Sequence, residues 1–70
     1  MGGGGAVPCR RYVLYMAWSP DKYRMGISAI PRVDFSYLQN TEGYQGMAFI
    51  SPPLPLALCE YLLADYTRKG

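Results

Sequence analysis

The chain has 70 residues, which is enough for one small domain and excludes a multidomain protein. Half of the residues are hydrophobic and 14% are aromatic, which excludes a disordered polar chain. Seven Lys and Arg residues against five Asp and Glu residues give a net charge of +2, which is weaker than the dense basic surface of most dedicated nucleic-acid binders. A second copy of the chain or another partner could complete so small a core.

The two cysteines, Cys9 and Cys59, and the absence of histidine exclude a four-ligand zinc site built by one chain. We expect both thiols to be reduced, because sequence spacing alone gives no support for a disulfide. Residues 1–8 are rich in glycine and predict a flexible lead to a single domain over 9–70. The longest apolar run, 12–18, is too short to span a membrane, and no targeting signal is present, so we expect a cytoplasmic protein.

The first half of the domain predicts a β-hairpin. Residues 12–18 are apolar on both alternating faces, which is typical of a central strand covered on both sides. Residues 19–22 read SPDK and predict a turn, so residues 23–29 form the second strand, with position 18 facing 23 and position 12 facing 29. Gly26 inside this strand indicates that another group approaches its backbone closely.

The second half predicts a helix, a strand and a second helix. Pro31 suits the first helical position, and apolar residues at helical spacing extend the helix over 31–40. Residues 45–51 predict a third strand, and a second helix follows over 54–68. The fold class is therefore α+β, a three-stranded antiparallel sheet with two helices in the order β-β-α-β-α. On the last helix we expect one packing stripe, made of Leu54, Leu58, Tyr61, Leu62 and Asp65.

The residues that could carry chemistry are tyrosines, arginines and one glutamate. An arginine can hold a phosphate with two parallel hydrogen bonds, and a carboxylate can hold a divalent metal. A tyrosine is a poor base unless its pKa, ordinarily near 10, is lowered. The candidates are Tyr12, Tyr15, Tyr23 and Arg24 on the hairpin, Arg32 at the start of the first helix, and Glu60 on the second.

The stretch YVLYMAWSPDKYRMGIS, followed by PRVDFSYLQ, resembles the start of a GIY-YIG nuclease domain. The likeness is to the small branch common in bacteriophages, in which the second motif reads approximately Tyr-Lys-Ile-Gly-Ile-Ser and a Pro-Arg segment opens the next helix. It covers residues 12–66 and implies the same order of elements. It also implies phosphodiester cleavage by a first-strand tyrosine, a tyrosine or basic residue before the glycine, a helical arginine and a metal-binding glutamate.

The resemblance assigns these roles residue by residue. Tyr12 or Tyr15 stands for the first-strand tyrosine, and Tyr23 and Arg24 precede the glycine of the second motif. Glu60 stands for the family's metal-binding glutamate. It would bind Mg²⁺ or Mn²⁺, the cofactor that a nuclease of this kind would need. Arg32 lies slightly before the family's arginine, where this chain instead has an aspartate, Asp34.

Three functions follow as expectations. The first is a minimal nuclease or nucleic-acid-binding domain, in which Tyr12 or Tyr15, Arg24, Arg32 and Glu60 converge on one concave surface. The second is a catalytically inactive interaction protein of a phage or mobile element, which binds and inhibits a host protein complex through exposed aromatic residues. That aromatic patch would contain Tyr44, Tyr61 and Tyr66. The third, a single-strand binder, is less favoured because the hairpin separates its two basic and aromatic clusters.

Overall fold

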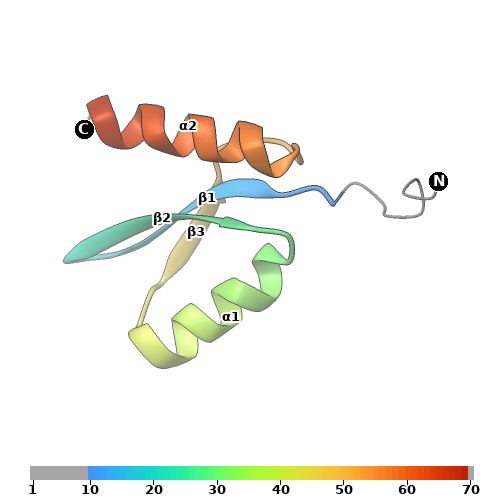
Figure 1. Ribbon diagram of the computed structural model, residues 1–70. Helices are drawn as coiled ribbons and strands as arrows, with labels where there is room; N and C mark the ends of the chain where they lie inside the picture. The colour runs from blue at the N-terminus through green and yellow to red at the C-terminus, as the bar shows by residue number, and fades with distance from the viewer. Residues whose placement is uncertain (1–9, 70) are drawn as a thin grey trace.

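A computed structural model describes residues 10–69 of the chain. The glycine-rich lead predicted for 1–8, and Cys9, lie outside the described residues. The described part confirms the predicted α+β fold, a three-stranded antiparallel sheet with two helices (Figure 1). The elements in chain order are β1 (Val13–Ser19), β2 (Lys22–Ser28), α1 (Pro31–Glu42), β3 (Gly46–Phe49) and α2 (Leu56–Lys69).

The sheet has the order β2-β1-β3, with β1 in the centre and antiparallel to both neighbours. Trp18 pairs with Tyr23 and Val13 with Ser28, which confirms the hairpin register expected from the turn. The two helices lie on opposite faces of the sheet (Figure 1). This arrangement explains why β1 is apolar on both faces, because each of its faces is covered by a helix. Neither helix is long and apolar enough to cross a membrane.

The core is divided by the sheet into two layers. On the α1 face a buried cluster forms from Tyr15, Ala17, Leu38 and Tyr44, with Phe35 and Met47 packed against it. On the α2 face the fully buried side chains are Leu14 and Cys59. Cys59 is a free thiol whose Sγ donates a hydrogen bond to the carbonyl of Tyr12, at 3.3 Å.

Two aromatic rings of β1 cover glycines on the neighbouring strands. A Cβ at Gly26 would lie 2.5 Å from the hydroxyl oxygen of Tyr15, its cross-strand partner. A Cβ at Gly46 would lie 2.4 Å from the ring of Trp18, again its cross-strand partner. Both separations are well below van der Waals contact, so each ring occupies the space that a side chain would need. The close approach that Gly26 indicated is therefore made by Tyr15.

The third strand is shorter than the predicted 45–51, because the chain turns in toward β1 at its end. The backbone N–H groups of Ile50 and Ser51 both donate to the carbonyl of Leu14, at 2.7 and 3.3 Å. The hydroxyl of Ser51 accepts the N–H of Leu14 at 3.0 Å and donates to the carbonyl of Pro52. Farther along, Leu54 pairs with Tyr12 through two backbone hydrogen bonds of 2.8 Å.

The packing stripe predicted for the second helix is wrong at two of its five residues, which are exposed. Leu58 and Tyr61 are 49% and 67% exposed, whereas Cys59, outside the expected stripe, is fully buried. The small side chain of Cys59 lets α2 lie close to the start of β1, where its thiol reaches the Tyr12 carbonyl. This contact rotates the helix so that Leu58 and Tyr61 turn toward solvent. The helix also begins at Leu56, after the prolines.

Candidate functional site

The candidate residues are divided between the two faces of the sheet. Tyr15, Arg24 and Arg32 lie on the α1 side, since residues 15 and 24 share the face of the α1 cluster and Arg32 belongs to α1 itself. Tyr23 and Glu60 lie on the α2 side, where both line a groove between β2 and α2. The three-stranded sheet therefore separates Glu60 from Arg24 and Arg32, and the convergence expected for a nuclease site is not found among residues 10–69.

Tyr15 is built into the core. Its side chain is 6% exposed and its ring lies over Gly26. Burial raises the pKa of Tyr15 above its ordinary value of 10.0, and this effect outweighs the opposing effect of Arg24. A tyrosine acting as a base needs a lowered pKa. The hydroxyl of Tyr15 therefore remains protonated at neutral pH. Tyr12, half-buried, contributes its backbone to the bridge with Leu54.

The hairpin cations bind the carboxyl end of α1. Arg24 Nη1 lies 3.5 Å from Glu42 Oε1. Lys22 Nζ donates to the main-chain carbonyl of Glu42 at 2.9 Å and lies 4.7 Å from the ring centre of Tyr44. Positive side chains are favoured at this end of a helix, because its carbonyls carry partial negative charge. The exposed pair contributes little stability, but it gives Arg24 a carboxylate partner.

The other end of α1 has an acidic residue where the resemblance expected an arginine. The Ser28 hydroxyl donates a hydrogen bond to the Asp34 carboxylate. The same hydroxyl accepts a hydrogen bond from the backbone N–H of Ile30, at 2.9 Å. A carboxylate in the first helical turn is favoured by the unpaired N–H groups there. Asp34 thus fixes the start of α1, and Arg32 is exposed beside it.

Around this end of α1 lies a surface that we call the α1 patch. It combines two arginines with exposed apolar side chains from α1, β3 and the flanking loops. Neither arginine has a carboxylate partner among residues 10–69, in contrast to Arg24, Arg68 and Lys69. The patch consists of Arg11, Ile30, Arg32, Val33, Phe49 and Pro53, all lining one shallow cavity.

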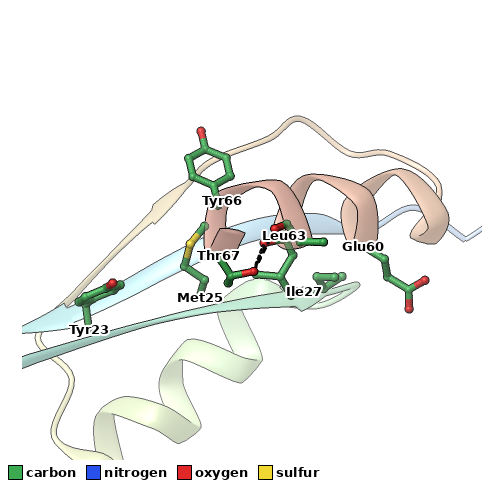
Figure 2. Close-up of a pocket in the computed structure, with 8 residues that line it drawn as sticks. Tyr23, Met25, Ile27, Glu60, Leu63, Tyr66 and Thr67 are labelled. Atoms are coloured by element: carbon green, nitrogen blue, oxygen red, sulfur yellow. Dashed lines mark hydrogen bonds between the residues drawn. The ribbon is translucent and has the colours of Figure 1, made fainter. Parts of the chain in front are cut away.

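On the opposite face of the sheet, an open groove of about 650 Å³ runs between β2 and α2 (Figure 2). We call it the β2–α2 groove. Figure 2 shows the Glu60 side chain at one end, with its carboxylate pointing away from the other lining side chains. No group of three His, Cys, Asp or Glu side chains that could hold a metal ion occurs within residues 10–69. Its lining residues are Tyr23, Met25, Ile27, Glu60, Leu63, Ala64, Tyr66 and Thr67.

A divalent cation does not fit this groove as a ready-made site. Glu60 is exposed and is the single carboxylate of the lining, which is otherwise mostly apolar. Mg²⁺ and Mn²⁺ need several oxygen ligands in a fixed geometry. Glu60 could supply one of them, and the other side-chain oxygens of the lining are the hydroxyls of Tyr23, Tyr66 and Thr67, of which Thr67 already bonds to the Leu63 carbonyl at 3.0 Å.

The aromatic patch expected for an interaction protein differs from the observed surface. Tyr44 is 6% exposed and belongs to the α1-face core, so its assignment to a surface patch is wrong. Tyr44 follows the left-handed Gly43, which turns the chain back under α1. Tyr61 and Tyr66 are exposed on α2, and Tyr66 lines the groove.

The sequence reading missed the members of the α1 patch other than Arg32. Ile30 and Val33 lie at or next to the start of the helix expected over 31–40, and Phe49 lies in the strand expected over 45–51, and neither pattern gives a reason to expect exposure. Ile30 and Val33 lie at or near the start of α1, beyond the edge of the core cluster. No protein-family model, characterised protein or solved structure matches the chain. Membership of the GIY-YIG family therefore stays a prediction.

Proposed function

We propose that the chain is a catalytically inactive interaction protein that binds an acidic surface of another protein through the α1 patch. The observation that carries the proposal is the exposure of three large apolar side chains beside two arginines that have no carboxylate partner within residues 10–69. Ile30, Val33 and Phe49 are 56%, 62% and 52% exposed. A small domain rarely leaves such residues clustered in solvent, and a cluster of this kind is typical of a binding surface.

The composition of the α1 patch indicates the chemistry of the partner. An apolar centre with a polar rim is the usual arrangement of a protein interface, in which aromatic residues and arginine are enriched. Arg11 and Arg32 have no carboxylate partner among the described residues, so each can bond to a carboxylate of the partner. The partner surface that fits is an apolar ridge flanked by Asp or Glu. Inhibition of a host protein complex would follow where such a ridge is itself needed to assemble or operate that complex.

A second candidate is nucleic-acid binding at the same patch. It is favoured by one observation, the position of Arg32 at the start of α1, where backbone N–H groups also attract anions. Phe49 could stack on one base. The aliphatic side chains of Ile30 and Val33 are less suited to this role, and Arg24, Arg68 and Lys69 are already paired with carboxylates. We therefore favour a protein partner.

A photo-crosslinking amino acid at position 33 tests the proposal, with the same group at the exposed Asn40 as the matched control. We expect position 33, and not position 40, to capture a protein from cells that contain its partner. The captured protein is then purified and titrated with the chain. Arg32→Glu should weaken that binding tenfold or more, since it reverses a charge facing carboxylates. Equal capture at both positions, or binding unchanged in Arg32→Glu, refutes the proposed surface.

The nucleic-acid functions are tested in parallel with labelled single-stranded and double-stranded DNA and RNA. The reactions contain Mg²⁺ or Mn²⁺, or EDTA, and include a Glu60→Ala variant. We expect no cutting. Metal-dependent cutting that disappears in Glu60→Ala would replace the interaction proposal with the nuclease expected from the resemblance. Uncut oligonucleotides that bind to the chain but not to Arg32→Glu would establish the second candidate.

A further inference from the structure

The outer edge of β2 has backbone groups that pair with no other strand in the described part of the chain, 10–69. β2 is an edge strand, since the sheet order is β2-β1-β3. The N–H and the carbonyl of Leu14 bond on the β3 side, so those of the next residue, Tyr15, point to β2 and its partner Gly26. Gly26 therefore faces inward, and the residues on either side of it face outward. The outward residues of β2 are Tyr23, Met25 and Ile27.

The same three residues have their side chains in the β2–α2 groove. Tyr23 is 68% exposed, and Met25 and Ile27 are half-buried. An edge strand of this length with no proline and an apolar face on one side is open to pairing with another strand. The apolar side chains and the free backbone groups thus occur on one edge and can be covered together by one added strand.

The sequence of β2 fits a second copy of itself. In an antiparallel pair with Met25 opposite Met25 of the second copy, all of Lys22–Ser28 is paired. Arg24 then lies opposite Gly26, and Lys22 opposite Ser28, so no like charges face each other. Shifting the register so that position 24 is at the centre sets Arg24 opposite itself, which is destabilising. The full-length register is therefore also free of charge repulsion.

The backbone and the side chains agree with this register. Residues 23, 25 and 27 all face outward, so the pairs 25 with 25 and 23 with 27 can each exchange both backbone hydrogen bonds. On the groove side Tyr23 would lie opposite Ile27 of the second copy, an aromatic and β-branched pair of the kind that stabilises antiparallel strands. On the other side, Gly26 has no side chain to oppose Arg24, which keeps its bond to Glu42.

We propose that the chain forms a symmetric homodimer in which the two β2 strands pair antiparallel about Met25. The two sheets then join into one six-stranded sheet. The two β2–α2 grooves meet on one side of this sheet and cover each other's apolar lining. This inference is independent of the proposed function, because the α1 patch lies on the other side of the sheet and remains free in the dimer.

A disulfide trap tests the register directly. All variants carry Cys9→Ser, so the buried Cys59 is the one native thiol beside the introduced cysteine. Met25→Cys would bring two thiols together across the symmetry axis, where the Cα atoms of a bonded antiparallel pair lie about 5.5 Å apart, within disulfide range. Phe49→Cys is the matched control, because Phe49 is exposed on the other edge strand, β3. We expect a covalent dimer under mild oxidation from Met25→Cys and not from Phe49→Cys.

The association itself is measured by sedimentation of the full chain over a range of concentrations, with Met25→Lys as the disrupting variant. This variant sets two charges opposite each other at the axis and should weaken the dimer at least tenfold. Circular dichroism verifies that the variant folds, and if it does not, the disulfide trap decides. A wild-type chain that sediments as a monomer up to about millimolar concentration, or a covalent dimer formed equally well through position 49, overturns the proposal.

Discussion

The contact between Tyr15 and Gly26 makes a sharp prediction for Gly26→Ala. The new Cβ would lie 2.5 Å from the Tyr15 hydroxyl oxygen and 2.6 Å from Cζ. Ordinary carbon contacts are about 3.5–4.0 Å, so the overlap is about 1 Å. Tyr15 cannot move aside easily, because its ring is 6% exposed and packs in the core cluster with Leu38 and Tyr44.

The expected loss follows from two opposing contributions. Overpacking a filled core costs about 1–3 kcal/mol, and an overlap of this size belongs at the upper end. Alanine regains about 0.5–1 kcal/mol, because it restricts the unfolded chain more than glycine does. We expect Gly26→Ala to lower the free energy of unfolding by about 2 kcal/mol, a large share of the stability of a domain of this size. The midpoint of thermal unfolding should fall by about 10 °C.

Urea unfolding followed by circular dichroism at a fixed protein concentration measures this loss, and Gly46→Ala is the matched control. Its Cβ would meet the Trp18 ring at 2.4 Å, but Trp18 is 39% exposed and can swing outward. The control should therefore lose less than about 1 kcal/mol. In a Tyr15→Leu background the cost of Gly26→Ala should shrink, since the blocking ring is absent. A fully stable Gly26→Ala, or an equal cost in both backgrounds, would refute the reasoning.

Three further predictions concern single groups. Ser51→Ala removes the acceptor of the buried Leu14 N–H, so the free energy of unfolding should fall by about 1–3 kcal/mol in urea titration, whereas Ser36→Ala, at an exposed site on α1, should change it little. Gly43 has a φ of 75°, so Gly43→Ala should cost about 1 kcal/mol in the same assay, and an unchanged midpoint would contradict the left-handed helix end. Burial raises the pKa of Tyr15 above 10.0, so the native chain keeps this proton at a pH where the unfolded chain releases it, and stability should decline as pH rises beyond about 10. Absorbance titration of the native chain should show a tyrosine that ionises above pH 10, and this step should be missing in Tyr15→Phe.

The order of elements and the hairpin register could be predicted because they depend on local signals. The run of apolar residues at 12–18, the Pro20 turn and Pro31 each determine the conformation of a few neighbouring residues. Gly26 correctly indicated a close approach, but the sequence could not name Tyr15 as the group that makes it. That identity depends on the cross-strand pair, which exists only once the hairpin has formed.

The arrangement of the candidate site could not be predicted, because it depends on which face of the sheet each helix covers. Tyr23 and Arg24 are neighbours in sequence, yet one faces α2 and the other α1. The rotation of α2 is set by the contact of Cys59 with the Tyr12 carbonyl, between residues far apart in the chain. Helical periodicity alone predicted that Leu58 and Tyr61 would face the sheet. Periodicity does not show whether a small thiol or a larger side chain lies where the helix approaches the sheet most closely.

The buried thiol of Cys59 makes the attachment of α2 measurable without any added probe. A thiol reagent can reach this sulfur only after α2 has moved away from the start of β1, because the side chain is fully enclosed and its Sγ is bonded to the Tyr12 carbonyl. In a Cys9→Ser chain, the rate of labelling therefore reports how often the helix detaches while the rest of the sheet stays intact. Labelling much faster than global unfolding would identify α2 as a separately opening unit of the native protein.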